Sequence, residues 1–138
     1  MEKKASTKFI RQFFIGSGVL LLLCILAVVV FDPFFQYHKP LKGLKAVLTD
    51  KEYQCVGSLK TFDYDSVIAG SSVSENYYND WFNQAFGCRT IKAIRSYGAT
   101  ADLCYLLDIA FSRQDLKYVF YNLDSAALVA EPETTYEL

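Results

Sequence analysis

The sequence predicts an α/β protein with an N-terminal transmembrane helix followed by a domain built on a parallel sheet. Two observations predict it. The 19 residues from position 13 to 31 carry no charge, and three short apolar runs alternate with helix-like segments between residues 66 and 123. Strands that alternate with helices over short connections form parallel sheets with right-handed crossovers. At 138 residues and 52% hydrophobic, the chain has room for one such domain and is not a disordered tail.

Residues 13–31 (FFIGSGVLLLLCILAVVVF) have the length of a membrane span. A helix of this length rises about 28 Å, which is close to the hydrocarbon thickness of a bilayer. The main alternative is a cleavable signal peptide, which has a shorter apolar region and a cleavage site of small residues. The stretch Val28–Pro33 (VVVFDP) offers no such site. We therefore expect one uncleaved span.

The charges divide unevenly about this span. Residues 1–12 carry Lys3, Lys4, Lys8 and Arg11 against Glu2, a local charge of +3, within a chain whose net charge is −1. The positive-inside rule then predicts a cytoplasmic tail over 1–12 and an external part from residue 32 onward, in the cell membrane. The near-zero net charge gives no electrostatic reason to expect a nucleic-acid partner.

The spacing of the cysteines and the histidine does not predict a metal site, and no cofactor is expected. Cys24 falls within the span, and Cys55, Cys88 and Cys104 follow it. An oxidising compartment leaves a Cys55–Cys88 disulfide open as an alternative, since three cysteines cannot all pair with one another. The spacings fit no zinc motif.

Residues 32–60 are expected to be a juxtamembrane linker containing one short helix. The segment Asp32–Pro40 (DPFFQYHKP) has two prolines around an aromatic cluster, which is typical of a membrane interface, with Lys39 extending toward the headgroups. His38 lies beside the membrane and is not expected to act as a catalytic base.

Residues 61–138 are expected to hold the folded α/β domain, and its elements are predicted from periodicity and turn residues. Gly70 closes the first strand, and Gly87 caps the first helix. The predicted elements are a strand at 66–69, a helix at 74–86, a strand at 90–94, a helix at 100–111 and a strand at 116–123.

Small and polar residues follow each predicted strand, at Gly70–Asn76 (GSSVSEN), Ser96–Thr100 and Asp124–Ser125. Because sites in parallel open sheets lie beyond the carboxyl ends of the strands, these three clusters are expected to converge. A serine on a tight strand-to-helix turn beside a glycine loop is the arrangement of an acyl-transfer site. The alternative is that Ser72 or Ser74 is only the N-cap of the following helix.

Residues 62–76 (FDYDSVIAGSSVSEN) resemble the first block of membrane-anchored SGNH (GDSL-like) hydrolases and acyltransferases of Gram-positive bacteria. The resemblance implies a three-layer α/β/α, flavodoxin-like sheet, truncated here because only three of the family's usual strands are present. It also implies that Ser72 is the nucleophile and that Gly98 contributes to the oxyanion hole. In the third block, Asn122 and Asp124 occupy the place of the usual G-x-N-D, with Asn122 one residue early.

The final block of that family, D-x-x-H, supplies the general base, and no histidine follows His38 in this sequence. We therefore expect the N-terminal portion of a longer enzyme, with strand order 2-1-3, that is inactive alone. The resemblance implies an extracytoplasmic serine esterase or O-acyltransferase acting on cell-envelope esters. Its partners would be the missing C-terminal half or an intramembrane acyltransferase. The alternative is a non-enzymatic, membrane-anchored binding module.

Overall fold

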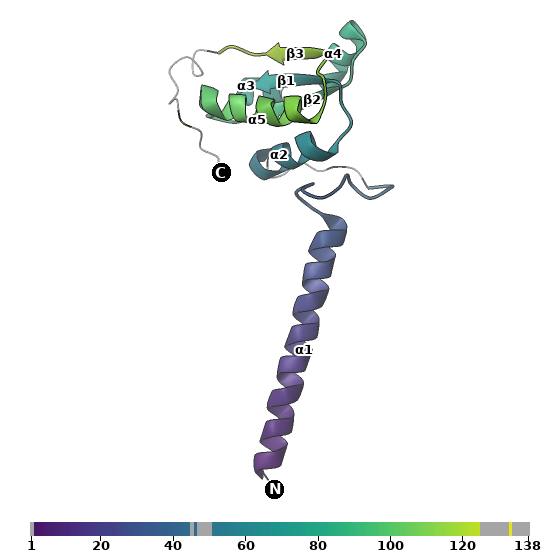
Figure 1. Ribbon diagram of the computed structural model, residues 1–138, viewed down its shortest axis with the longest axis vertical. Coiled ribbons are helices and arrows are strands. Elements are labelled where there is room, and N and C mark those ends of the chain that lie inside the picture. Colours follow the sequence, from purple (N-terminus) through teal and green to yellow (C-terminus); the bar gives the residue numbers. More distant parts are fainter. Residues whose placement is uncertain (1, 45, 47–50, 125–132, 134–138) are drawn as a thin grey trace. The chain divides into compact units, whose positions relative to one another are not determined.

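The computed structural model describes residues 2–44, 46, 51–124 and 133, and the chain divides between Pro33 and Phe34 into two compact units (Figure 1). The first unit contains α1 (Glu2–Phe31). In the described part of the chain, α1 is the one helix long and apolar enough to cross a membrane, over Thr7–Phe31. The helix begins at Glu2, so the basic residues before the predicted span belong to the same helix.

The second unit is built on a parallel sheet of β1 (Ser66–Gly70), β2 (Thr90–Ile94) and β3 (Tyr118–Tyr121). The sheet order is β2-β1-β3, which confirms the predicted order. All five residues of β1 are buried, because helices cover both of its faces. The mixed α/β architecture predicted from the sequence is therefore confirmed for this unit.

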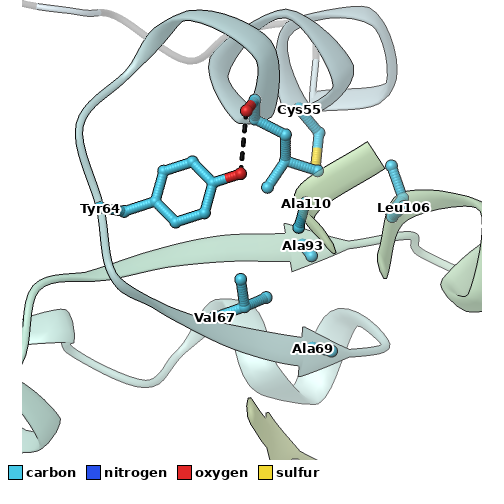
Figure 2. Packing of buried hydrophobic residues seen from close by; sticks show 8 residues of the cluster. Cys55, Tyr64, Val67, Ala69, Ala93, Leu106 and Ala110 are labelled. Atoms are coloured by element: carbon cyan, nitrogen blue, oxygen red, sulfur yellow. Dashed lines mark hydrogen bonds between the residues drawn. The ribbon is translucent and has the colours of Figure 1, made fainter. Parts of the chain in front are cut away.

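One face of the sheet packs against α2 (Lys51–Thr61) and α5 (Thr100–Arg113) (Figure 2). Side chains alternate between the faces of a strand, and Val67 and Ala69 of β1 point to this side. The Tyr64 hydroxyl donates to the Leu59 carbonyl over 2.9 Å, which ties the end of α2 to the start of β1 (Figure 2). The buried cluster consists of Cys55, Leu59, Tyr64, Val67, Ala69, Ala93, Leu106 and Ala110.

The helix α2 lies within the segment that the sequence assigned to a linker over 32–60. Its residues Cys55 and Leu59 are buried in the core, so the predicted domain boundary at residue 61 falls at the end of a packed helix. The folded unit extends back to Phe34. Local periodicity is weak here because Gly57 and small polar residues interrupt the apolar pattern of α2.

The opposite face of the sheet carries α4 (Asn79–Phe86), whose rings pack on β3. The ring centroids of Phe82 and Phe86 lie 4.8 and 4.9 Å from that of Phe120. Phe120 pairs in register with Ile68, the β1 residue on this side. Helices thus cover both faces of the sheet, in three layers.

The single helix predicted over 74–86 is wrong, because the structure has α3 (Ser72–Glu75) and then α4. The chain is extended at Tyr78, which separates the two helices. The start of α4 is held by Asn79, whose Nδ2 donates to the Thr90 carbonyl over 2.7 Å. The predicted cap at Gly87 is confirmed, with φ of 60° and its N–H on the Asn83 carbonyl at 3.0 Å.

Side chains occupy the outer edge of β2. The Thr90 N–H donates to Asn83 Oδ1 over 2.8 Å. Further along, Cys55 Sγ donates to the Lys92 carbonyl at 3.4 Å and accepts from the Ile94 N–H. These side chains satisfy backbone groups that would otherwise bind another strand.

The Cys55–Cys88 disulfide left open by the sequence is not formed. Both cysteines are free and buried, and Cys88 Sγ contacts the Phe82 carbonyl at 3.6 Å on α4. Cys55 instead lies at the β2 edge, where it contacts α2, β2 and the core.

Replacing Leu106 by alanine should lower the free energy of unfolding by about 2–5 kcal/mol, because the side chain is fully buried among α2, α5 and the sheet. The measurement is urea unfolding of the full chain in detergent micelles, followed by fluorescence of Trp81, the single tryptophan. The control Leu123→Ala removes the same atoms from a side chain that is 65% exposed, and should cost less than about 0.5 kcal/mol. Equal losses in the two variants would refute the core described above.

Burial raises the pKa of the Cys55 thiol to about 11, so at pH 8 only about one thiol in a thousand is ionised. Maleimide at pH 8 should therefore modify the exposed Cys104 first and Cys55 only after unfolding. Mass spectrometry of peptides over time measures this order, with a urea-unfolded sample as the control. Comparable rates at both cysteines in the folded chain would show that Cys55 is not buried at the strand edge.

Candidate functional site

The turn from β1 into α3 is capped by Ser71. Ser71 has extended backbone angles (φ −83°, ψ −166°), and its hydroxyl accepts the Val73 N–H at 3.4 Å. Serine is favoured at this position because its oxygen satisfies a backbone donor that the helix leaves unpaired. The sequence alternatives that Ser72 or Ser74 caps the helix are therefore wrong.

Glycine is required where β1 ends. A Cβ on Gly70 would lie 2.2 Å from Ser74 Oγ and 2.9 Å from the Cβ of Asn122. Ser74 is fully buried, so its hydroxyl has no open space to move into. The close approach of these segments packs the end of β1 against both α3 and the residue that follows β3.

The carboxyl ends of β1 and β3 are joined by a hydrogen bond from the Ser71 hydroxyl to the Asp124 carboxylate. The loop after β2 reaches the same place. Ser96 Oγ donates to Glu75 Oε1 over 2.9 Å, and the Arg95 N–H donates to the Gly70 carbonyl over 3.2 Å. Described residues of all three polar clusters thus meet around α3, at one rim of the sheet. Ser125 of the third cluster lies outside the described residues.

Ser72, the predicted nucleophile, is the first residue of α3 and is exposed. Its hydroxyl has no hydrogen-bond partner in the described ranges. The hydroxyl that contacts Asp124 belongs to Ser71, which the sequence analysis did not single out. The available signal was its position directly after the strand-ending glycine, where an N-cap serine is expected.

Asn122 lies at the rim, as the resemblance implied. Its N–H donates to the Ala69 carbonyl over 2.8 Å, and its Oδ1 accepts from the Tyr77 hydroxyl over 3.2 Å. The Nδ2 of Asn122 is buried and has no partner among the residues that the structure describes. It is therefore an unpaired, buried donor at the rim.

Gly98 forms a tight turn instead of presenting its N–H to the rim. This N–H donates to the Arg95 carbonyl over 3.2 Å. A Cβ on Gly98 would lie 2.3 Å from Arg95 Cγ, which explains the glycine. The next residue back, Tyr97, is fully exposed with φ of 56°. In this conformation, the oxyanion donor predicted at Gly98 is engaged within its own loop.

No imidazole contacts this rim in the described structure. His38 Nδ1 lies 2.6 Å from the Lys39 carbonyl, in the segment that follows α1. The carboxylates at the rim are Glu75 and Asp124, and each accepts a serine hydroxyl. No group of three metal-binding side chains occurs among the described residues. The rim therefore offers hydroxyls, carboxylates and an amide.

The phenol of Tyr121 at the end of β3 completes the surroundings of Asp124. Burial raises the pKa of Tyr121 above its ordinary value, and Cys104 and Asp124 add to the effect. The phenol is therefore neutral at physiological pH.

Comparison with known proteins adds no relative. No family model matches the chain, and neither the curated proteins nor the solved structures include a significant match.

Replacing Ser71 by alanine should lower the free energy of unfolding by about 1–2 kcal/mol, because it removes the cap of α3 and the hydrogen bond to Asp124. Urea unfolding of the full chain in micelles measures the loss. The control Ser112→Ala removes an exposed hydroxyl that contacts only the Ile109 carbonyl, and should change stability by less than about 0.5 kcal/mol. If Ser71→Ala leaves the free energy of unfolding unchanged, the hydrogen bond between the β1 and β3 ends does not hold the rim together.

Proposed function

We propose that the rim around α3 is the nucleophile half of an SGNH-type serine esterase or O-acyltransferase. The observation that carries the proposal is that an exposed serine, Ser72, lies where the loops after all three parallel strands meet. Sites in such sheets lie at this edge. The resemblance of residues 62–76 to the first SGNH block supports the same assignment.

The proposed reaction is acyl transfer through Ser72. The Ser72 oxygen attacks the carbonyl carbon of an ester, its proton passes to a base, and the alcohol leaves with a proton. Water or a second alcohol then attacks the acyl-serine and releases Ser72. The unpartnered Nδ2 of Asn122 is the proposed donor to the negative oxygen of the intermediate.

Ser71 and Asp124 have a positioning role in this proposal. Their hydrogen bond connects the start of α3 to the end of β3, so it fixes the turn that carries Ser72. Asp124 does not touch the Ser72 hydroxyl and is not proposed as its base. The base is proposed to come from a D-x-x-H segment on the C-terminal half or on a partner polypeptide.

The open edge of β3 supports a place for that additional part. β3 pairs with β1, and no other strand pairs with it among the described residues. Tyr118, Val119 and Tyr121 are each more than one third exposed along it. A strand added here would cover these side chains and bring its own carboxyl end to the rim.

The setting that we propose is the outer face of the cell membrane, with α1 as the anchor. The supporting features are the length and apolar composition of α1 and the basic residues that precede its apolar run. The proposed substrates are esters of cell-envelope carbohydrates or teichoic acids, because those are the esters that an anchored external domain meets.

A second candidate is a non-enzymatic binding module with the same anchor. The observation that favours it is that the Gly98 N–H is engaged with Arg95 and no imidazole contacts Ser72 in the described structure. In this candidate, the polar rim binds a ligand without forming a covalent intermediate.

A fluorophosphonate probe distinguishes these candidates, with free imidazole supplied as the base. In the acyl-transfer proposal, the full chain in micelles should label slowly at Ser72, and imidazole should accelerate labelling roughly tenfold, as a small part of what a positioned base provides. Ser72→Ala should abolish the labelling, whereas Ser112→Ala, a control at another exposed serine, should keep it. Mass spectrometry of peptides locates the probe. Labelling that is absent from Ser72 at every imidazole concentration would support the binding module instead.

A further inference from the structure

A hollow of about 640 Å³ lies away from the rim, between residues 37–42 and the last turns of α2 and α5. Basic side chains from all three segments line it. Lys42 comes from the segment after α1, Lys60 from the last turn of α2 and Arg113 from the last turn of α5. His38 and Lys39 also line the hollow.

The segment that forms one wall is held by packing rather than left as an open linker. Phe35 is buried, and its ring lies 5.1 Å from that of Phe62. Gln36 Nε2 donates to the Tyr53 carbonyl over 3.2 Å. A Cβ on Gly57 would lie 2.0 Å from the Phe34 carbonyl oxygen, so glycine permits the close approach to α2. Residues 34–36, which lead into this wall, are therefore held against the same helix that contributes Lys60.

The basic side chains that line the hollow outnumber the described carboxylates that pair with them. Lys39 pairs with Asp63, whose pKa is lowered chiefly by the hydrogen bond from that lysine. Lys42, Lys60 and Arg113 have no ion pair with any described carboxylate. Cations gathered around one space repel one another, and an anion within it would relieve that repulsion.

The hollow lies a short distance along the chain from the end of α1. Tyr37 comes six residues after Phe31, the end of α1, so an extended chain reaches at most about 20 Å from that helix end. The phosphates of lipid headgroups lie in the layer that borders the hydrocarbon core. Arginine and lysine bind phosphate oxygens, and Tyr37, which is 72% exposed, has the amphipathic ring that suits a membrane interface.

We propose that this hollow binds the phosphate of an anionic phospholipid headgroup. The site is separate from the rim: it rests on the proposed role of α1 as a membrane anchor and not on the acyl transfer proposed for Ser72. Its ligand groups would be the Lys42 and Lys60 ammonium groups and the Arg113 guanidinium, which come from three segments that converge on one space.

Native mass spectrometry of the full chain tests this proposal. The chain is released from detergent micelles containing equal amounts of phosphatidylglycerol and phosphatidylcholine, and the retained lipid is identified. The wild-type chain should retain phosphatidylglycerol in preference. Lys60→Gln with Arg113→Gln should weaken that binding about tenfold or more, since each basic residue adds to the attraction of an anionic lipid.

The matched control is Arg89→Gln with Lys117→Gln, which removes the same charge from exposed residues that do not line the hollow. Thermal unfolding of both variants verifies that they are folded. Equal phosphatidylglycerol retention in the wild type and the Lys60/Arg113 variant would overturn the proposal, as would an equal loss in the control. A parallel titration with inorganic phosphate distinguishes the source of the anion. Tight phosphate binding without preference between the lipids would overturn a membrane occupant.

Discussion

The folded unit depends on the parallel pairing of β1 with a strand on each side. Every residue of β1 is buried, so its apolar side chains contribute to both faces at once. Val67 and Ala69 pack toward α2 and α5, and Ile68 lies on the side of Phe120 and α4. The same pairing fixes where the loops after the three strands emerge, and thus where the polar rim forms.

Much of this unit follows from local sequence. The apolar run at Val67–Ala69 and the glycines at 70 and 87 predict a buried strand and a helix end, because each depends on nearby residues alone. These local signals do not predict the break between α3 and α4. It depends on Asn79 and Asn83 bonding to Thr90 of β2, a contact that forms only when the sheet is assembled.

The helix α2 was predicted only as one short helix within a linker, for a related reason. Its apolar positions are few, and its stability comes from Leu59 and Cys55 packing on the sheet and α5. Its close approach to Phe34 depends on Gly57, a residue that lowers helix propensity when read locally. Tertiary packing thus determines that α2 is a helix, although the apolar periodicity of its sequence is weak.

At the site, too, some features follow from neighbouring residues in the sequence, and others depend on tertiary contacts. The sequence indicated the loops that form the rim, since each directly follows a strand. It did not indicate which serine meets Asp124, because Ser71 and Ser72 are neighbours and only the backbone angle at Ser71 directs its hydroxyl to the end of β3. The Gly98 turn likewise depends on the position of Arg95, which spacing alone does not predict.

The two edges of the sheet differ in whether side chains occupy their backbone hydrogen-bonding groups. The β2 edge is occupied by the Cys55 thiol and by the amides of Asn79 and Asn83, so a further strand there would have to displace three hydrogen-bonding side chains. The β3 edge presents Tyr118, Val119 and Tyr121. A further strand would therefore pair more readily at β3 than at β2, and Ser72, at the end of the central strand, would then lie inside the row of strand ends instead of near its margin.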